Sequence, residues 1–303
     1  MSARCTKTMA IVLAVVLLVG AFPICSISAL ETQAVTLPFS AEEFLVLLYT
    51  NRQRLAAGLN PLTCTADLQT IGDIRAKEIG ESFSHTRPDG SDCFSVIDSF
   101  DVSWNTIGEN IAYGYPTPAA VVEGWMNSPG HRANILTENF THIGIGASNS
   151  RWVQFFVGCY GSENYTFTAI HTLADISFGM EIDEMFMYAE LENAVYGTCY
   201  LPIGGEFVSG YDPNKTGSQT VTVSFLGFTE SLELNIPGNP AGDVDGDRQV
   251  TAEDARLALR AAVGLTILTA QQKQAADTDG DNKVTSADAR LILRIAVGLD
   301  TIS

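Results

Sequence analysis

The sequence predicts a multidomain protein with a mixed helix-and-strand domain, a β-rich segment and a small helical module built on two acidic loops. Three observations indicate this. Amphipathic helical patterns and short apolar runs fill the chain up to about residue 161, β-type patterns dominate from about residue 165, and an internal repeat begins at residue 243. The 303 residues leave room for two or three domains, and a hydrophobic fraction of 46% is ample for their cores.

The N-terminus has the pattern of a secretory signal peptide. Arg4 and Lys7 precede an apolar run over residues 9–21, and small residues follow up to Ala29. The run is too short for a stable membrane span. We therefore expect a signal peptide over residues 1–29, no membrane span in the mature chain, and a secreted, extracellular protein associated with a complex or a cell surface.

Charge and cysteine content limit the partners and the chemistry. The net charge of −18 argues against nucleic acid as a partner, because phosphate neutralisation needs Lys and Arg, and it disfavours anionic membrane surfaces. After signal removal four cysteines remain, which allow two disulfides in three pairings. Free buried thiols are the alternative. The four are Cys64, Cys93, Cys159 and Cys199.

Helices and two strands are expected in the first half of the chain. Ser40 is a plausible N-cap for a first helix, and Asn51 and Arg54 are placed on its polar side. A further helix is expected after Pro118, ending at a Ser-Pro-Gly turn before His131. The other expected elements are helices over Ala41–Ala57, Asp67–Glu81 and Phe94–Phe100, and strands over Ile143–Ala147 and Trp152–Gly158.

Four titratable residues in this half are candidates for a joint site: His85, Glu109, Glu123 and His131. Glu109 and Glu123 stand among apolar residues, where a charged group needs a partner. His131 follows Glu123 by eight residues, so the chain can fold back between them. A two-His, two-Glu group could bind a metal or move protons. The alternative is two Glu–His pairs that only hold loops together.

The same stretch resembles the CAP superfamily of cysteine-rich secretory proteins, antigen 5 and pathogenesis-related proteins. The matching motifs are YTNRQRLAAGLNPL, SHTRPDG, GENIAYG, VVEGWMNSPGHRANIL, THIGIGA and WVQFFVG, in this order. The resemblance implies an α-β-α sandwich over residues 36–161 whose cavity tetrad is the four residues named above. In some members the two histidines, here His85 and His131, hold a divalent metal, so we expect that Zn²⁺ could bind there. Relatives have been linked to lipid binding and to disputed protease action, which leaves a lipid, peptide or glycan ligand open.

The segment over residues 165–237 is expected to be rich in β-strands. Thr220–Phe225 and Glu230–Ile236 alternate as strands do, and loops rich in Gly, Asp and Asn surround them. The run VSGYDPNKTGSQTVTVSFLGFTESLELNI resembles the end of bacterial immunoglobulin-like modules. The resemblance implies a small immunoglobulin-like β-sandwich that serves as a spacer, and no residue in the segment suggests catalysis.

Beyond a linker at Pro237–Pro240 lies an internal repeat with an offset of 34 residues. DVDGDRQVTAEDARLALRAAVGL and DTDGDNKVTSADARLILRIAVGL differ at only seven of 23 positions. Each copy sets oxygen donors at the spacing of a calcium loop followed by a helix. We expect two Ca²⁺ sites. Their ligands are Asp243, Asp245, Asp247, Gln249 (carbonyl), Thr251 and Asp254, then Asp277, Asp279, Asp281, Lys283 (carbonyl), Thr285 and Asp288.

Position 6 of each loop departs from the usual glycine, being Arg248 in the first copy and Asn282 in the second. Asn tolerates a positive φ better than Arg does, so the first site is expected to be weaker.

Two loop–helix units without an entering helix resemble a type I-like dockerin, here over residues 238–303. That resemblance implies calcium-dependent docking onto a cohesin module of a scaffoldin, in a cellulosome-type complex. The interpretation is therefore a secreted complex component whose first domain binds an apolar ligand or a metal. Two alternatives stay open. One is a hydrolase acting on polysaccharide or peptide through the tetrad, although no established catalytic motif is present, and the other is an adhesive or structural cell-surface protein.

Overall fold

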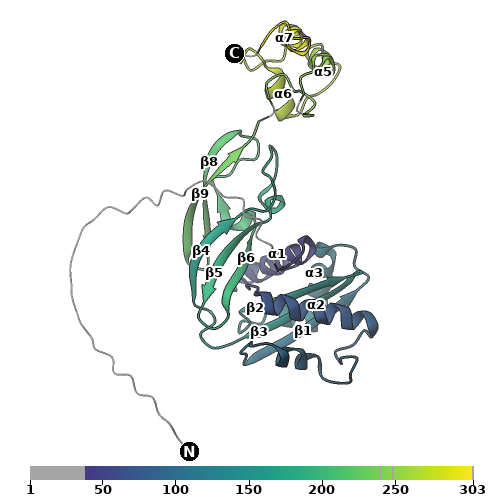
Figure 1. The fold of residues 1–303 in the computed structure, drawn as a ribbon, viewed down its shortest axis with the longest axis vertical. Coiled ribbons are helices and arrows are strands. Elements are labelled where there is room, and N and C mark those ends of the chain that lie inside the picture. Colours follow the sequence, from purple (N-terminus) through teal and green to yellow (C-terminus); the bar gives the residue numbers. More distant parts are fainter. Residues whose placement is uncertain (1–37, 239, 248, 302–303) are drawn as a thin grey trace, which may run out of the picture. The chain divides into compact units, whose positions relative to one another are not determined.

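The structure, a computed structural model, describes residues 38–238, 240–247 and 249–301 (Figure 1). The expected signal peptide and Arg248 lie outside these residues. The N-terminal part contains α1 (Ala41–Ala56), α2 (Ala66–Glu81), the 3₁₀ helix η1 (Cys93–Ser99), β1 (Thr106–Tyr113), α3 (Pro118–Met126), α4 (Pro129–Ile135), β2 (His142–Ser148) and β3 (Arg151–Gly158). No helix among the described residues is long and apolar enough to cross a membrane.

The three strands form an antiparallel sheet in the order β1-β3-β2, covered by helices on both faces. Alternate residues of β3 enter two separate cores: Val153 and Phe155 pack with Leu68 of α2, whereas Trp152 and Phe156 pack with α1 and α3. This alternation is what a strand buried on both faces requires. The layering is the expected α-β-α sandwich.

Helix α2 lies unusually close to β2 because both carry glycine at the contact. A Cβ on Gly144 would lie 1.8 Å from the carbonyl oxygen of Leu68, and one on Gly146 would lie 2.0 Å from that of Gly72. Neither distance is physically attainable for a side chain. The glycines of THIGIGA therefore set the spacing between the helix and the sheet.

Two residues expected on the polar side of α1 are buried. Asn51 is fully buried and exchanges two hydrogen bonds with the backbone of Leu62. Arg54 is 1% exposed and donates to four backbone carbonyls, at residues 60, 135, 137 and 140. Both side chains satisfy loop backbone that would otherwise be buried without partners. They support the fold.

The prediction that a Ser-Pro-Gly turn precedes His131 is wrong. Pro129 opens the helix α4, where its missing N–H is not needed, and His131 lies within that helix. The segment containing Glu109 is the strand β1, which the sequence analysis left unassigned.

The middle segment consists of two three-stranded antiparallel sheets. Their orders are β4-β5-β6 and β7-β8-β9, so each sheet joins strands that are consecutive in the chain. One apolar cluster, including Leu191, Leu201, Val221 and Leu234, draws on both sheets. A β-rich segment is confirmed, but an immunoglobulin-like arrangement is not shown. The strands are β4 (Tyr165–His171), β5 (Met187–Asn193), β6 (Gly197–Ile203), β7 (Val208–Ser209), β8 (Gly217–Phe225) and β9 (Phe228–Ile236).

The sheet β4-β5-β6 also packs on the N-terminal domain. Tyr188 is fully buried within the cluster that contains Phe39 and Phe44 of that domain. Cys64 and Tyr200 exchange backbone hydrogen bonds of 2.9 and 2.8 Å. The middle segment therefore shares a core with the first domain, unlike a freely hinged spacer.

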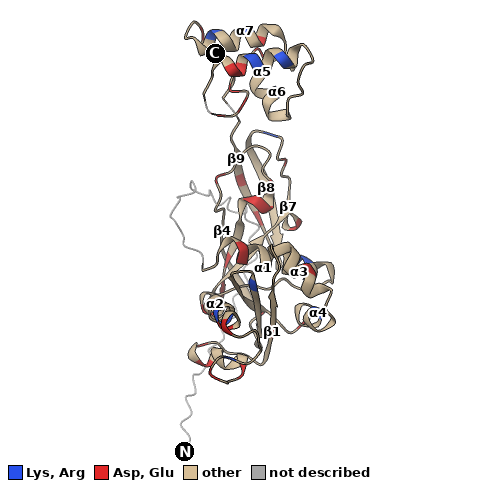
Figure 2. Cartoon of the chain, turned by 90° about the vertical axis from the view of Figure 1, so that its right-hand side faces the viewer, with Lys and Arg blue, Asp and Glu red and all other residues tan. Residues whose placement is uncertain are grey.

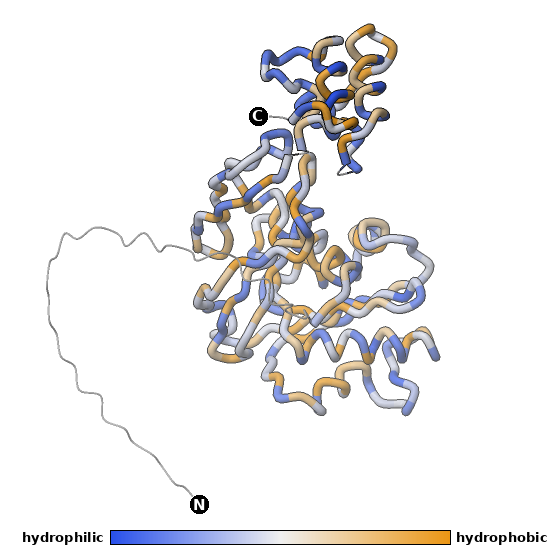
Figure 3. Tube along the Cα trace, turned by 45° about the horizontal axis from the view of Figure 1, so that its top comes forward, coloured by the Kyte–Doolittle hydropathy of each residue, from blue (hydrophilic) through white to orange (hydrophobic). Residues whose placement is uncertain are grey.

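The C-terminal module contains α5 (Ala252–Ala262), α6 (Ala270–Ala276) and α7 (Ser286–Ala296). Apolar and polar residues alternate along its helices (Figure 3), and Ala258 and Ile292 are fully buried between α5 and α7. The repeat predicted α5 and α7. It did not predict α6, which lies in the connection where the two copies do not align.

The four cysteines within the described residues carry free thiols. Cys64, Cys93 and Cys199 are buried, and Cys159 is half-buried. The structure thus has the free thiols that the sequence analysis named as the alternative to disulfides.

Candidate functional site

His85 and Glu109 form a close pair at β1, the edge strand of the sheet. The His85 Nδ1 atom lies 2.7 Å from Glu109 Oε1. The Glu109 side chain is 1% exposed, whereas that of His85 is 56% exposed. The pair therefore joins a buried carboxylate to an imidazole that solvent and ligands can reach.

Arg75 of α2 holds the carboxylate of Glu109 in place. Its Nε donates to Glu109 Oε2 at 2.6 Å and its Nη2 to Oε1 at 3.3 Å. The Arg75 side chain is completely buried and also pairs with Glu78 at 2.5 Å. A buried carboxylate and guanidinium compensate each other here, as buried charges must.

The loop that carries His85 is fixed through the same network. Arg75 Nη2 donates to the carbonyl of Ser84 at 3.0 Å, and Arg87 pairs with Glu78 at 2.7 Å. Hydrogen bonds from both arginines lower the pKa of Glu78, although its partial burial acts in the opposite direction. The anchor residues Arg75, Glu78 and Arg87 were not identified from the sequence, because nothing in their spacing distinguishes them from surface charges.

Glu123 and His131 lie on α3 and α4, the two helices that follow β1 in the chain. Glu123 lies on α3 with an exposed side chain, and His131 lies half-buried on α4, where its carbonyl accepts a hydrogen bond from Asn110 at 3.1 Å. Burial lowers the pKa of His131, and the charge of His85 lowers it further. His85 thus influences His131 electrostatically. Among the described residues, the tight group of potential metal ligands around Glu109 contains His85 and Cys93, and it includes neither Glu123 nor His131.

Cys93 is a further residue of this site that the sequence did not indicate. It opens η1, and its backbone N–H donates to the carbonyl of His85 at 3.0 Å. Burial, followed by the negative charge of Glu109, raises the pKa of the Cys93 thiol to about 12.

The two ring nitrogens of His85 differ in protonation. A carboxylate that is paired with a guanidinium accepts hydrogen bonds, so Nδ1 is the nitrogen that donates. The lone pair then lies on Nε2, which can take up a proton or bind a metal. The arrangement suits ligand binding or proton transfer at an exposed imidazole.

The first acidic loop of the C-terminal module gathers its carboxylates around one point. Asp243, Asp245 and Asp254 offer oxygen atoms that all lie within 4.8 Å of one another. Asp254 is fully buried, and its Oδ1 accepts the backbone N–H of Val244 at 2.8 Å and that of Asp245 at 3.0 Å. The donor set consists of oxygens alone, which fits Ca²⁺.

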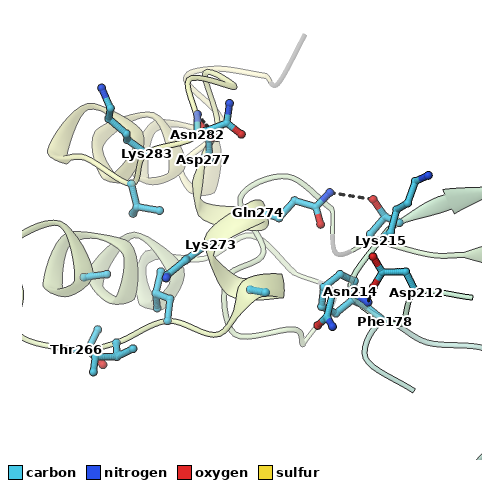
Figure 4. A pocket seen from close by; sticks show the side chains of 16 residues that line it. Phe178, Asp212, Asn214, Lys215, Thr266, Lys273, Gln274, Asp277, Asn282 and Lys283 are labelled. Atoms are coloured by element: carbon cyan, nitrogen blue, oxygen red, sulfur yellow. Dashed lines mark hydrogen bonds between the residues drawn. The ribbon is translucent and has the colours of Figure 1, made fainter. Parts of the chain in front are cut away.

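The second loop also gathers three carboxylates, but its third member is at loop position 5, whereas the first loop uses Asp254 at position 12. Asp277, Asp279 and Asp281 offer oxygens within 4.8 Å of one another. Asp277 and Asn282 lie together (Figure 4), and the Asn282 backbone N–H donates to Asp277 Oδ2 at 2.8 Å. Asn282 has the positive φ, +64°, that this loop position requires.

The threonines at loop position 9 serve as helix caps. Thr251 is the N-cap of α5 and donates from its hydroxyl to Asp254 at 3.0 Å, and Thr285 is the N-cap of α7 and donates to Asp288 at 2.8 Å. In the first loop, the backbone N–H of Gln249 at position 7 donates to the side chain of Asp247 at position 5, at 2.8 Å. The equivalent bond of the second loop joins Lys283 to Asp281, also at 2.8 Å.

Two family models match the chain. Residues 47–160 match the cysteine-rich secretory protein family (CAP), and residues 241–295 match the dockerin type I domain. The chain therefore contains a CAP domain and a type I dockerin domain. Type I dockerin domains generally bind calcium.

Relatives match the CAP part. The uncharacterized protein YkwD of Bacillus subtilis (strain 168) is 43% identical over 123 residues, which are 39% of this chain and 48% of that protein. The uncharacterized membrane protein YlbC of the same organism is 31% identical over 120 residues, which are 39% of this chain and 35% of that protein. The chain thus spans about half or less of these relatives. A solved extracellular protein containing a SCP domain, from Bacillus anthracis str. Ames, is 28% identical, with a TM-score of 0.36 over 38% of this chain and 39% of that one.

Proposed function

We propose that this protein is a secreted component of a cellulosome-type extracellular complex, attached by calcium-dependent binding of its C-terminal module to a cohesin module of a scaffoldin. We place the CAP-like domain at residues 36–161, the β-rich segment at 165–237 and the dockerin at 238–303. The observation that carries the proposal is the duplicated unit of an acidic loop and a helix, in which each copy gathers three carboxylates.

The two helices that follow the loops present nearly equal surfaces. Leu259 of α5 and Leu293 of α7 are each 45% exposed, and Val263 and Val297 are 60% and 59% exposed. Arg residues also lie on both helices (Figure 2). Exposed apolar residues beside charges are typical of a protein-binding surface. The equivalence of the two faces supports docking through either one.

A binding measurement tests the attachment. The full chain is titrated onto immobilised cohesin modules in Ca²⁺ and again after EGTA. Saturable binding that EGTA abolishes is expected, because the loops cannot keep their carboxylates together without the cation. A double variant, Asp243→Ala with Asp277→Ala, should lose binding, whereas Asp300→Ala, outside both loops, should retain it. Binding that persists in EGTA would refute calcium dependence.

For the CAP domain we propose a binding role, with a metal or an apolar, peptide or glycan ligand held at the His85 group. The support is an imidazole that is anchored through one nitrogen and yet 56% exposed. A purely structural pair would be expected to bury both partners. A hydrolase that uses the same His–Glu pair is the second candidate, because the free Nε2 could act as a general base.

Calorimetric titration of Zn²⁺ into the Ca²⁺-saturated full chain tests the binding role, beside His85→Ala and His131→Ala. Loss of one saturable site in either variant supports a metal. Unchanged binding in both variants refutes a metal held by these histidines. Turnover of a peptide or glycan substrate that Glu109→Gln abolishes, with folding intact, would favour the hydrolase.

A further inference from the structure

The group around Glu109 combines three chemically different donors. The ligand atoms of His85, Cys93 and Glu109 all lie within 4.8 Å of one another. A tetrahedral zinc site has ligands at about 2.0–2.3 Å from the ion, so its ligand atoms are roughly 3–4 Å apart. Ligand atoms that already lie within 4.8 Å of one another can therefore reach these separations through small side-chain movements.

Each of the three comes from a different element with its own support. His85 lies in the loop after α2, Cys93 opens η1, and Glu109 belongs to β1. Glu109 Oε2 is occupied by Arg75 Nε at 2.6 Å, whereas Oε1 accepts from His85 Nδ1 at 2.7 Å and from Arg75 Nη2 at the longer distance of 3.3 Å. An ion bound at Oε1 would take the place of the His85 Nδ1 proton, which would move to Nε2 through solvent. Cys93 is 3% exposed, so an ion would enter past the exposed His85.

We propose that His85, Cys93 and Glu109 form a site for a borderline or soft divalent cation such as Zn²⁺, with Cys93 as a thiolate ligand. This inference rests on the proposed binding role of the His85 group and adds a ligand to it. When the sulfur–metal bond forms, the thiol proton leaves to solvent. The fourth position stays open for water, for a substrate oxygen or for a further side chain.

The thiol would determine which metal binds. Sulfur ligands favour Zn²⁺ and softer ions, whereas Ca²⁺ takes oxygen ligands. The acidic loops of the C-terminal module offer oxygen donors, and the CAP site offers sulfur and nitrogen. One chain can thus bind Ca²⁺ at the acidic loops and a softer cation at the CAP site, and neither cation replaces the other.

Cobalt spectroscopy tests the sulfur ligand directly. The full chain is saturated with Ca²⁺ to fill the acidic loops and then titrated with Co²⁺, and the near-ultraviolet thiolate-to-cobalt charge-transfer band is recorded. The band should saturate at one equivalent and disappear on addition of Zn²⁺. Cys93→Ser should abolish it, Cys159→Ser is the matched thiol control and should keep it, and His85→Ala should weaken binding at least about tenfold.

The outcomes separate this inference from the proposed binding role. A missing band, or a band that Cys93→Ser leaves unchanged, overturns the sulfur ligand. If Co²⁺ binds without that band and His131→Ala abolishes the binding, a two-histidine site stands and this inference is wrong. Tryptophan fluorescence of each variant shows whether the domain is folded, because all three tryptophans lie between residues 104 and 152.

Discussion

Glu43 should make the CAP domain less stable as the pH rises through neutrality. This first-turn residue of α1 is 6% exposed, and it accepts the backbone N–H of Ser40 at 2.7 Å and that of Ala147 at 3.2 Å. Burial raises the pKa of its carboxyl to about 7, and the nearby charge of Asp73 contributes in the same direction. The folded domain therefore holds a proton that the unfolded chain releases near pH 4.5.

The direction of the change in stability with pH follows from the difference between the folded-state and unfolded-state pKa of Glu43. A raised pKa in the folded state gives stability that is fully present below about pH 4.5 and is lost as the pH rises through about 7. A difference of about 2.5 pKa units corresponds to an upper value of about 3 kcal/mol. His142 acts in the opposite sense at lower pH, because burial lowers its pKa to about 3 and protonation then favours unfolding.

The free energy of unfolding is measured by urea titration of the full chain in Ca²⁺ at several pH values between about pH 5 and pH 8. Tryptophan fluorescence monitors the unfolding. Glu43→Gln stays neutral, so its free energy of unfolding should vary less with pH than that of the wild type, by up to about 3 kcal/mol. Glu42→Gln, on the same helix turn but exposed, is the control and should follow the wild type. Equal pH dependence in the two variants would refute the argument.

Three further predictions concern packing, buried charge and metal. Gly144→Ala should destabilise the CAP domain by about 3 kcal/mol or more, because its Cβ would overlap the carbonyl of Leu68, whereas Gly130→Ala, with open space around it, should be near neutral in the same urea titration. Arg54→Met should cost about 3 kcal/mol in free energy of unfolding, because four carbonyls lose their donor; a loss below about 1 kcal/mol would show that water replaces it. EGTA should reduce the helical circular dichroism of the dockerin while tryptophan fluorescence stays constant, since the tryptophans lie outside it, and a parallel loss of both signals would contradict independent folding of the module.

Local patterns were sufficient for several elements. The capping box at Ser40 and Glu43 marks the start of α1, and alternation over Thr220–Phe225 falls within β8. The acidic repeat predicted its two loop–helix units to within a residue or two, because loop ligands and the following helix are both encoded over about a dozen positions. The strands β4 to β6 were missed, since their periodicity is interrupted by turns and a bulge.

By itself, the sequence indicated the order of the CAP and dockerin parts and predicted the two acidic loops, and it named His85 and Glu109 as members of a four-residue candidate group. Only the tertiary structure decided that Arg75 and Cys93 join His85 and Glu109, and that Glu123 and His131 lie outside the tight group around Glu109. It also showed that Asn51 and Arg54 face the interior, where buried loop carbonyls and amides need them. The physical reason is the same in each case. These contacts join elements far apart in the chain, and such contacts depend on packing and burial, which no local spacing records.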